Sequence, residues 1–302
     1  MRYNLYPGNL RPLQAILTCN AGAVLEVTLL ISDEVYDSAR RPHPLIDEFI
    51  TLVKYKELLI QFISRAIKTR YKRSILGVVW TMLNPLLMMV VLTLVFSNLF
   101  RFNIPHYPVY ILSGLLVWNF FSATTNGAMG DMIWSGNLLN RIYVPKSVFA
   151  VSAIGTGLVN LGLSMIPLLL ISLAVGVKFT PALLVMPFAV VLLALFALGV
   201  GLLLESAAVF FADMMPVYEV ILTIWFYATP IIYPIEILPP ALIWLERLNP
   251  LYYMVTLFRE PLFEGTVPTW DMWAVATAFA VITFLVGGLV FTSKSNEYAY
   301  RL

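Results

Sequence analysis

Five cations lie close together immediately before a long uncharged run. They are Arg65, Lys68, Arg70, Lys72 and Arg73. No Asp, Glu, Lys or Arg then follows in residues 74–100. Clustered Lys and Arg beside an apolar run stay on the cytoplasmic side of a membrane and attract anionic lipid headgroups. We therefore expect an interfacial helix that leads directly into a membrane span, with its cations placed to bind headgroups.

Few other residues have the types and spacing that catalysis or metal binding requires. Glu205, Asp213 and Glu219 form one acidic group, but ordinary charges at a membrane boundary explain them equally well. His43 and His106 stand apart without metal-ligand spacing, and a single cysteine excludes an intrachain disulfide. There is no GxxxxGK[ST] phosphate loop. The sequence thus predicts no catalytic residue, no metal site and no ATP hydrolysis by this chain.

The composition is that of an integral membrane protein. Of 302 residues, 60% are hydrophobic and 12% charged, and the net charge is +2. The apolar residues fall into charge-free runs that are long enough to cross a bilayer. Their central portions hold no ionisable residue, which argues against ion-coupled transport. The basic residues follow membrane boundaries and do not interleave with stacking aromatics, so no nucleic-acid partner is expected.

We predict an all-α membrane domain with six spans over residues 74–302. The approximate span bounds are 74–99, 109–130, 147–175, 182–204, 217–233 and 273–292. Basic residues gather on the side that holds both termini, and the other side has few. The basic residues on that opposite side are Arg101, Lys178, Arg247 and Arg259. The positive-inside rule therefore predicts a multi-pass protein of the cytoplasmic (inner) membrane with both termini in the cytoplasm.

Three further segments flank or interrupt these spans. Residues 1–44 form an extension of unknown structure, and 45–73 contain an amphipathic helix with polar residues every three or four positions. We expect this helix to lie in the membrane plane; the alternative is packing against a soluble domain. Residues 237–245 and 248–258 are apolar but too short to cross. Two re-entrant helices fit them better than a plain outer loop.

The cytoplasmic connection before the third span contains a segment that is too apolar for a free loop. Its residues are Leu138, Leu139, Asn140, Arg141, Ile142, Tyr143, Val144 and Pro145. A short helix with an exposed Leu, Ile and Tyr face is typical of docking into a partner's groove. The alternative is packing against the chain's own basic helix.

Several of these segments match the motifs of a known family. They are RYKRSILGVVWTMLNP, YILSGLLVWNFF, NLLNRIYVPKSVF, and FYATPIIYPIEILPP followed by LNPLYYMVTLFRE. On these motifs, the chain from about residue 45 to its end resembles the membrane subunit of ABC-2-type polysaccharide exporters, the O-antigen and teichoic-acid permeases. Residues 1–44 fall outside the resemblance.

The resemblance implies a homodimer joined to two copies of an ABC ATP-binding subunit, which would hold ATP and Mg²⁺; this chain needs no cofactor. Residues 138–145 would be the coupling helix, and Arg65–Arg73 the gate or interface helix beneath the channel mouth. From their charge and position, we expect these cations to attract the pyrophosphate of a polysaccharide's lipid carrier. Six aromatics become candidates to line the channel. They are Trp118, Phe120, Phe121, Trp225, Phe226 and Tyr227. The alternatives are a small-molecule or drug exporter of the same superfamily, and a membrane enzyme of glycolipid assembly.

Overall fold

The computed structural model describes residues 44–72, 77–98, 104–134 and 145–301. In these residues every regular element is a helix, which confirms the predicted all-α class. The α-helices are α1 Pro44–Lys54, α2 Lys56–Tyr71, α3 Val79–Asn98, α4 Tyr107–Trp134, α6 Val148–Val175, α7 Met186–Phe210, α8 Met214–Ala228, α9 Ile243–Leu248, α10 Pro250–Phe263 and α11 Trp270–Arg301. Short 3₁₀ turns are η2 Pro181–Val185, η3 Ile235–Ile237 and η4 Pro240–Leu242. Of the predicted extension over residues 1–44, only Pro44 is described, and it begins α1.

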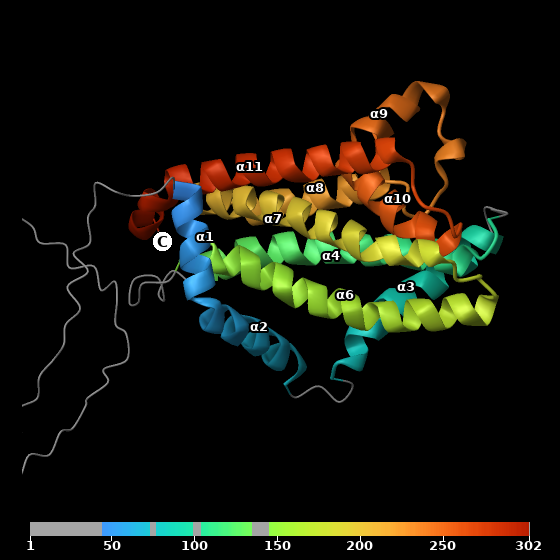
Figure 1. Ribbon diagram of the computed structural model, residues 1–302, viewed down its shortest axis with the longest axis horizontal. Helices are drawn as coiled ribbons and strands as arrows, with labels where there is room; N and C mark the ends of the chain where they lie inside the picture. The colour runs from blue at the N-terminus through green and yellow to red at the C-terminus, as the bar shows by residue number, and fades with distance from the viewer. Residues whose placement is uncertain (1–43, 73–76, 99–103, 135–144, 302) are drawn as a thin grey trace, which may run out of the picture. The chain divides into compact units, whose positions relative to one another are not determined.

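The long helices of the unit that starts at Pro44 lie side by side and alternate in direction (Figure 1). At the start of α6, Ser147 is hydrogen-bonded to Glu48 of α1. At the start of α4, the Tyr107 hydroxyl donates to the carbonyl of Ile232 (2.8 Å), just before η3. The helix ends therefore gather at two opposite sides, called here the α1 end and the α10 end.

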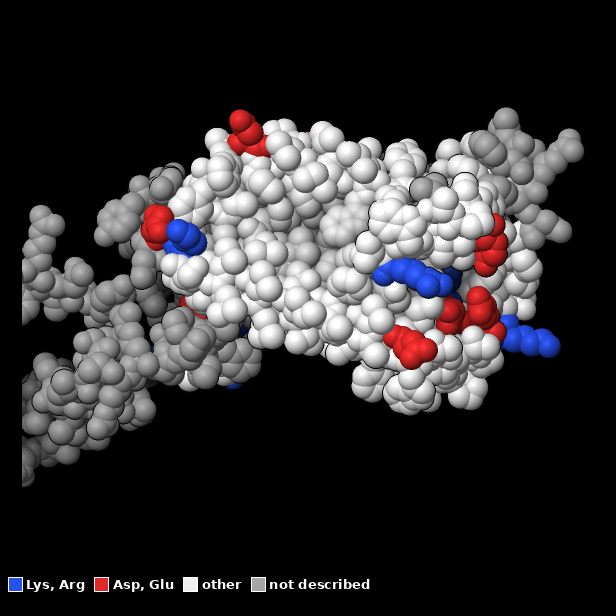
Figure 2. Space-filling view, turned by 90° about the horizontal axis from the view of Figure 1, so that it is seen from above, with Lys and Arg blue, Asp and Glu red and all other residues white. Residues whose placement is uncertain are grey.

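Four helical stretches are long and apolar enough to cross a membrane. They are Val79–Ser97, Val148–Val175, Pro181–Phe210 and Trp270–Ser295. Figure 2 shows the charged side chains near the two ends of this unit, with an uncharged band between them. The other two predicted spans correspond to α4, which has the length but a more polar composition, and to α8, which has 15 residues. Six crossings therefore stay a prediction.

Two glycines set the distance between α7 and α11. A Cβ on Gly199 would lie 2.6 Å from the backbone nitrogen of Phe284, and a Cβ on Gly287 would overlap the Gly199 carbonyl. Small residues let helix backbones approach closely, and within a membrane this packing is a main source of helix association. These glycines therefore hold the last described helix against the centre of the bundle.

The predicted amphipathic helix over residues 45–72 is two helices in the structure. Tyr55 leaves the helical conformation, with φ −96° and ψ 25°. On either side of this break, α1 packs against α11 and α2 packs against α6. Because the two halves follow different helices, one straight helix cannot satisfy both contacts. Ile60 of α2 remains 57% exposed, as an interfacial helix requires.

The region predicted to form two re-entrant helices also differs in its bounds. Helix α8 ends at Ala228, before two prolines, Pro230 and Pro234, that cannot continue it. A short α9 follows, and Asn249 then caps α10 by accepting a hydrogen bond from the backbone of Leu251 (3.1 Å). Helix α10 packs against α4, α7 and α11. It is therefore part of the packed bundle at the α10 end.

Candidate functional site

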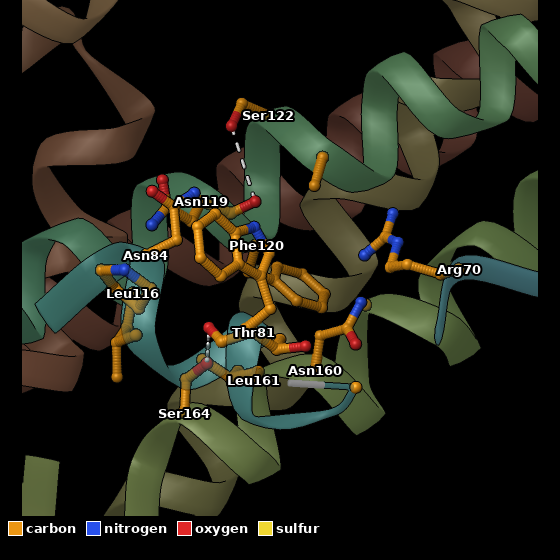
Figure 3. Close-up of a pocket in the computed structure, with 15 residues that line it drawn as sticks. Arg70, Thr81, Asn84, Leu116, Asn119, Phe120, Ser122, Asn160, Leu161 and Ser164 are labelled. Atoms are coloured by element: carbon orange, nitrogen blue, oxygen red, sulfur yellow. Dashed lines mark hydrogen bonds between the residues drawn. The ribbon is translucent and has the colours of Figure 1, made fainter. Parts of the chain in front are cut away.

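A cavity of about 440 Å³ opens among α2, α3, α4 and α6 (Figure 3). Each of α3, α4 and α6 contributes one asparagine to its wall: Asn84, Asn119 and Asn160. In Figure 3, Asn84 and Asn119 lie on one side of Phe120, and Asn160 and Arg70 lie on the other. We call this space the amide cavity. Uncharged amides in its wall can both donate and accept hydrogen bonds.

A second cavity, of about 430 Å³, lies among α3, α4 and α8. Three aromatic side chains line it, Trp118, Phe226 and Tyr227, and we call it the aromatic cavity. Asn84 and Asn119 line both cavities. The two spaces therefore adjoin along α3 and α4 and form one polar and aromatic surface.

The six aromatics that were predicted to line a channel lie in different surroundings. Phe120 lines the amide cavity, and three others line the aromatic cavity. Phe121 is fully buried and stacks on Phe196, with ring centroids 5.5 Å apart. The indole of Trp225 packs edge-on against Phe121 and donates a hydrogen bond to Asn249 (2.8 Å). In the single chain, Phe121 and Trp225 thus hold α4, α7, α8 and α10 together.

The predicted basic cluster lies on and just after α2. Arg65, Lys68, Arg70 and Lys72 are all exposed, and Arg73 lies outside the described residues. Arg70 also lines the amide cavity. The cations are therefore available to anionic groups, and one of them is next to the cavity.

The predicted docking segment lies outside the described residues except for Pro145, which is buried. The two residues that follow it connect three helices. The Glu48 carboxylate of α1 accepts from the Ser147 hydroxyl (2.6 Å), and the Lys146 ammonium donates to the Ser295 carbonyl of α11. Burial lowers the pKa of Lys146, and the nearby Glu48 carboxylate opposes this shift. We call these contacts the junction.

The acidic group that an enzyme would need is not assembled. Glu205 is fully buried in α7, whereas Asp213 and Glu219 are exposed. The acidic neighbours of Glu205 are instead Asp131 and Glu48. Within the described ranges, no group of three metal-ligating side chains occurs. The three carboxylates therefore offer no common catalytic centre.

A buried cation at the α10 end was not predicted as a site residue. The Arg259 guanidinium donates to the carbonyls of Pro230 (3.0 Å) and Ile231 (3.1 Å), and lies 3.7 Å from the centre of the Tyr110 ring. A Cβ on Gly114 would overlap the guanidinium. We call this arrangement the arginine clamp. It fixes the non-helical segment after α8 against α4.

The sequence does carry weak signals for these missed residues. A lone arginine within the apolar run of α10 needs hydrogen-bond partners when it is buried. Likewise, asparagines within apolar spans mark contacts other than lipid. Neither signal says which distant residues converge.

Known proteins resemble this chain along most of its length. Residues 57–263 match the ABC-2 type transporter family. The O-antigen export system permease protein RfbA of Myxococcus xanthus is 31% identical over 250 residues, which are 82% of this chain and 96% of that protein. RfbA of Klebsiella pneumoniae is 26% identical over 80% of this chain and 94% of its own. The polysialic acid transport protein KpsM of Escherichia coli is 23% identical, with 77% and 91% covered.

Proposed function

This chain belongs to the ABC-2 type transporter family, and we propose that it forms the channel of an ATP-driven exporter of lipid-linked polysaccharide. It is a membrane permease subunit and not an enzyme; ATP is hydrolysed by a separate subunit. The main support for a polysaccharide substrate is the similarity to an O-antigen export permease, which extends over 96% of that protein. The adjoining amide and aromatic cavities support it, because amides and aromatic faces both bind sugars.

The complete transporter is a homodimer with two ATP-binding subunits. Each copy of this chain crosses the cytoplasmic membrane six times, with both termini in the cytoplasm. Helix α3 supports this assembly, since only 11% of its apolar stretch is buried in the single chain. A second copy would cover part of that surface and enclose the aromatic cavity. The ATP-binding subunit docks on residues 138–145, so that its closure moves the junction.

Deleting the gene for this chain tests the transport function. Cells that still make the polymer are expected to retain it inside at normal length, because synthesis is intact and export is lost. The measurement is the polymer's size and its accessibility to an antibody on intact and on permeabilised cells. Polymer of altered length would indicate an enzyme of assembly. Normal surface polymer would contradict the proposal. In the intact transporter, stimulation of ATP hydrolysis by small hydrophobic compounds would favour a drug exporter.

Charge reversal on α2 tests the entrance for the anionic lipid carrier. Changing Arg65, Lys68 and Arg70 together to Glu is expected to reduce export at least tenfold, since each reversal replaces attraction to phosphate by repulsion. Export rate and the amount of inserted subunit are measured together.

The matched control for this prediction reverses two exposed cations at the α10 end, Lys178→Glu and Arg247→Glu. This control should export at the normal rate. Full export by the α2 variant, at a normal subunit level, would exclude a role for these cations in recognising cargo.

A further inference from the structure

We propose that the amide cavity is a binding subsite for the hydroxyl groups of a sugar unit in the passing chain. Asn84 and Asn119 donate to and accept from the hydroxyls, and the largely buried Phe120 lies in the wall between the helices. This assignment rests on the export function proposed above and adds to it the residues that recognise the cargo.

The position of the asparagines in the helices is the first support. Asn119 lies 12 residues from the first residue of α4, which is about 18 Å along the helix axis. Its side chain and that of Asn84 are exposed in the single chain. An amide that faces hydrocarbon without a partner costs several kcal/mol. This face of α3 and α4 is therefore turned toward a polar environment and away from the lipid hydrocarbon.

The unused hydrogen-bonding capacity is the second support. In the described part of the chain, the contact shown for Asn119 is made by its backbone carbonyl, which accepts from Ser122 (3.5 Å). The side-chain amides of Asn84 and Asn119 make no hydrogen bond within that part. Each amide offers two donor hydrogens and one acceptor oxygen. A sugar hydroxyl also donates and accepts, so it can pair with either group.

The lining also indicates which kind of ligand fits. Serines and a threonine add hydroxyls to the wall, and its aromatic side chains are Trp80 and Phe120. Among the lining residues that the structure describes, none is a carboxylate, and Arg70 is the single cation. The volume of about 440 Å³ lies in the range of small-ligand sites. This polar lining suits a hydroxylated sugar ring better than a hydrophobic drug.

The place of the cavity makes it useful for transport. Asn84 and Asn119 also line the aromatic cavity. A sugar chain that stacks on Trp118 or Phe226 would therefore meet the amides at the same level of the bundle. Hydrogen bonds supplied there replace part of the water that the hydroxyls lose on entering the membrane.

The test combines substitution with cross-linking. Asn84→Leu and Asn119→Leu, which keep the side-chain size and remove its polarity, are made together. A photo-cross-linker is attached at Ala123→Cys, a position in the cavity wall, after Cys19→Ser. Inverted membrane vesicles holding the whole transporter receive ATP and radiolabelled lipid-linked polysaccharide from the native strain. We expect cross-linked polysaccharide, and about a tenfold loss of cross-linking and export in the double variant, as two lost hydrogen bonds predict.

Two controls separate the possible outcomes. Asn126→Leu, two turns from Asn119 on the same helix and outside both cavities, should export normally. The cross-linker at Leu170→Cys, which is 61% exposed on α6, should not reach polysaccharide. Full cross-linking and export by the double variant would overturn the subsite. So would loss of the dimer in that variant, which would show that the amides join two copies of this chain. If the polymer reaches the surface without this chain, the proposed function itself fails.

Discussion

Valine in place of Gly199 or Gly287 is expected to separate α7 from α11 and to leave little folded protein in the membrane. The new side chain would meet backbone atoms, which cannot rotate aside as a flexible side chain can. The helices must therefore move apart along much of their shared length. We expect destabilisation at or above the upper end of the roughly 1–3 kcal/mol that is typical of overpacked sites. Thermal unfolding in detergent and the level of inserted protein are the measurements.

Gly162 provides the matched control for this prediction. It lies inside α6, and a Cβ there would have no heavy atom within 4 Å. Gly162→Val should therefore retain a normal unfolding temperature. Equal destabilisation at Gly162 and Gly287 would mean that the close approach of the two backbones is not what makes the glycine necessary.

Replacing Arg259 with methionine is expected to release the non-helical segment after α8 and to abolish export. The variant keeps a long side chain but leaves the carbonyls of Pro230 and Ile231 without their donors. A buried polar group that loses its partner costs about 1–3 kcal/mol, so about 2–6 kcal/mol is expected for the two. Unfolding temperature and protease cleavage within residues 229–242 measure the effect.

Two further variants distinguish the effect of losing the arginine clamp from the general effect of removing a positive charge. Arg247→Met removes an exposed cation at the same end of the bundle and should change neither measurement. Gly114→Ala keeps Arg259 but pushes its guanidinium out of place, so it should reproduce the Arg259→Met result in part. A protected segment and normal export in Arg259→Met would show that the hydrogen bonds of the clamp are dispensable.

The sequence predicts the long helices because each contains a long uncharged run. The predicted third span, 147–175, differs by one residue from α6 at Val148–Val175. The local sequence pattern predicts helix boundaries less well where two consecutive helices pack on different neighbours. The break at Tyr55 follows from α1 packing on α11 while α2 packs on α6, and no property of residues 45–72 alone reveals it.

The site was predicted less completely, because it depends on residues that are distant in the sequence. Asn84, Asn119 and Asn160 come from three helices and meet in one cavity. The aromatic residues show the same difficulty: Trp118 and Phe121 are one helical turn apart, yet one lines a cavity and the other is fully enclosed. Composition indicates that aromatics are present, whereas the packing of α7 and α8 decides which of them line a cavity.

The junction has a mechanical consequence for the whole subunit. The residues that follow the predicted docking segment are bonded to α1 through Glu48 and to α11 through Ser295. If the ATP-binding subunit docks on that segment as proposed, its push would load α1 and α11 at the same moment. In the proposed transporter, the first and the last described helices would then shift together, and the movement of the docked subunit would reach both without passing through the centre of the bundle.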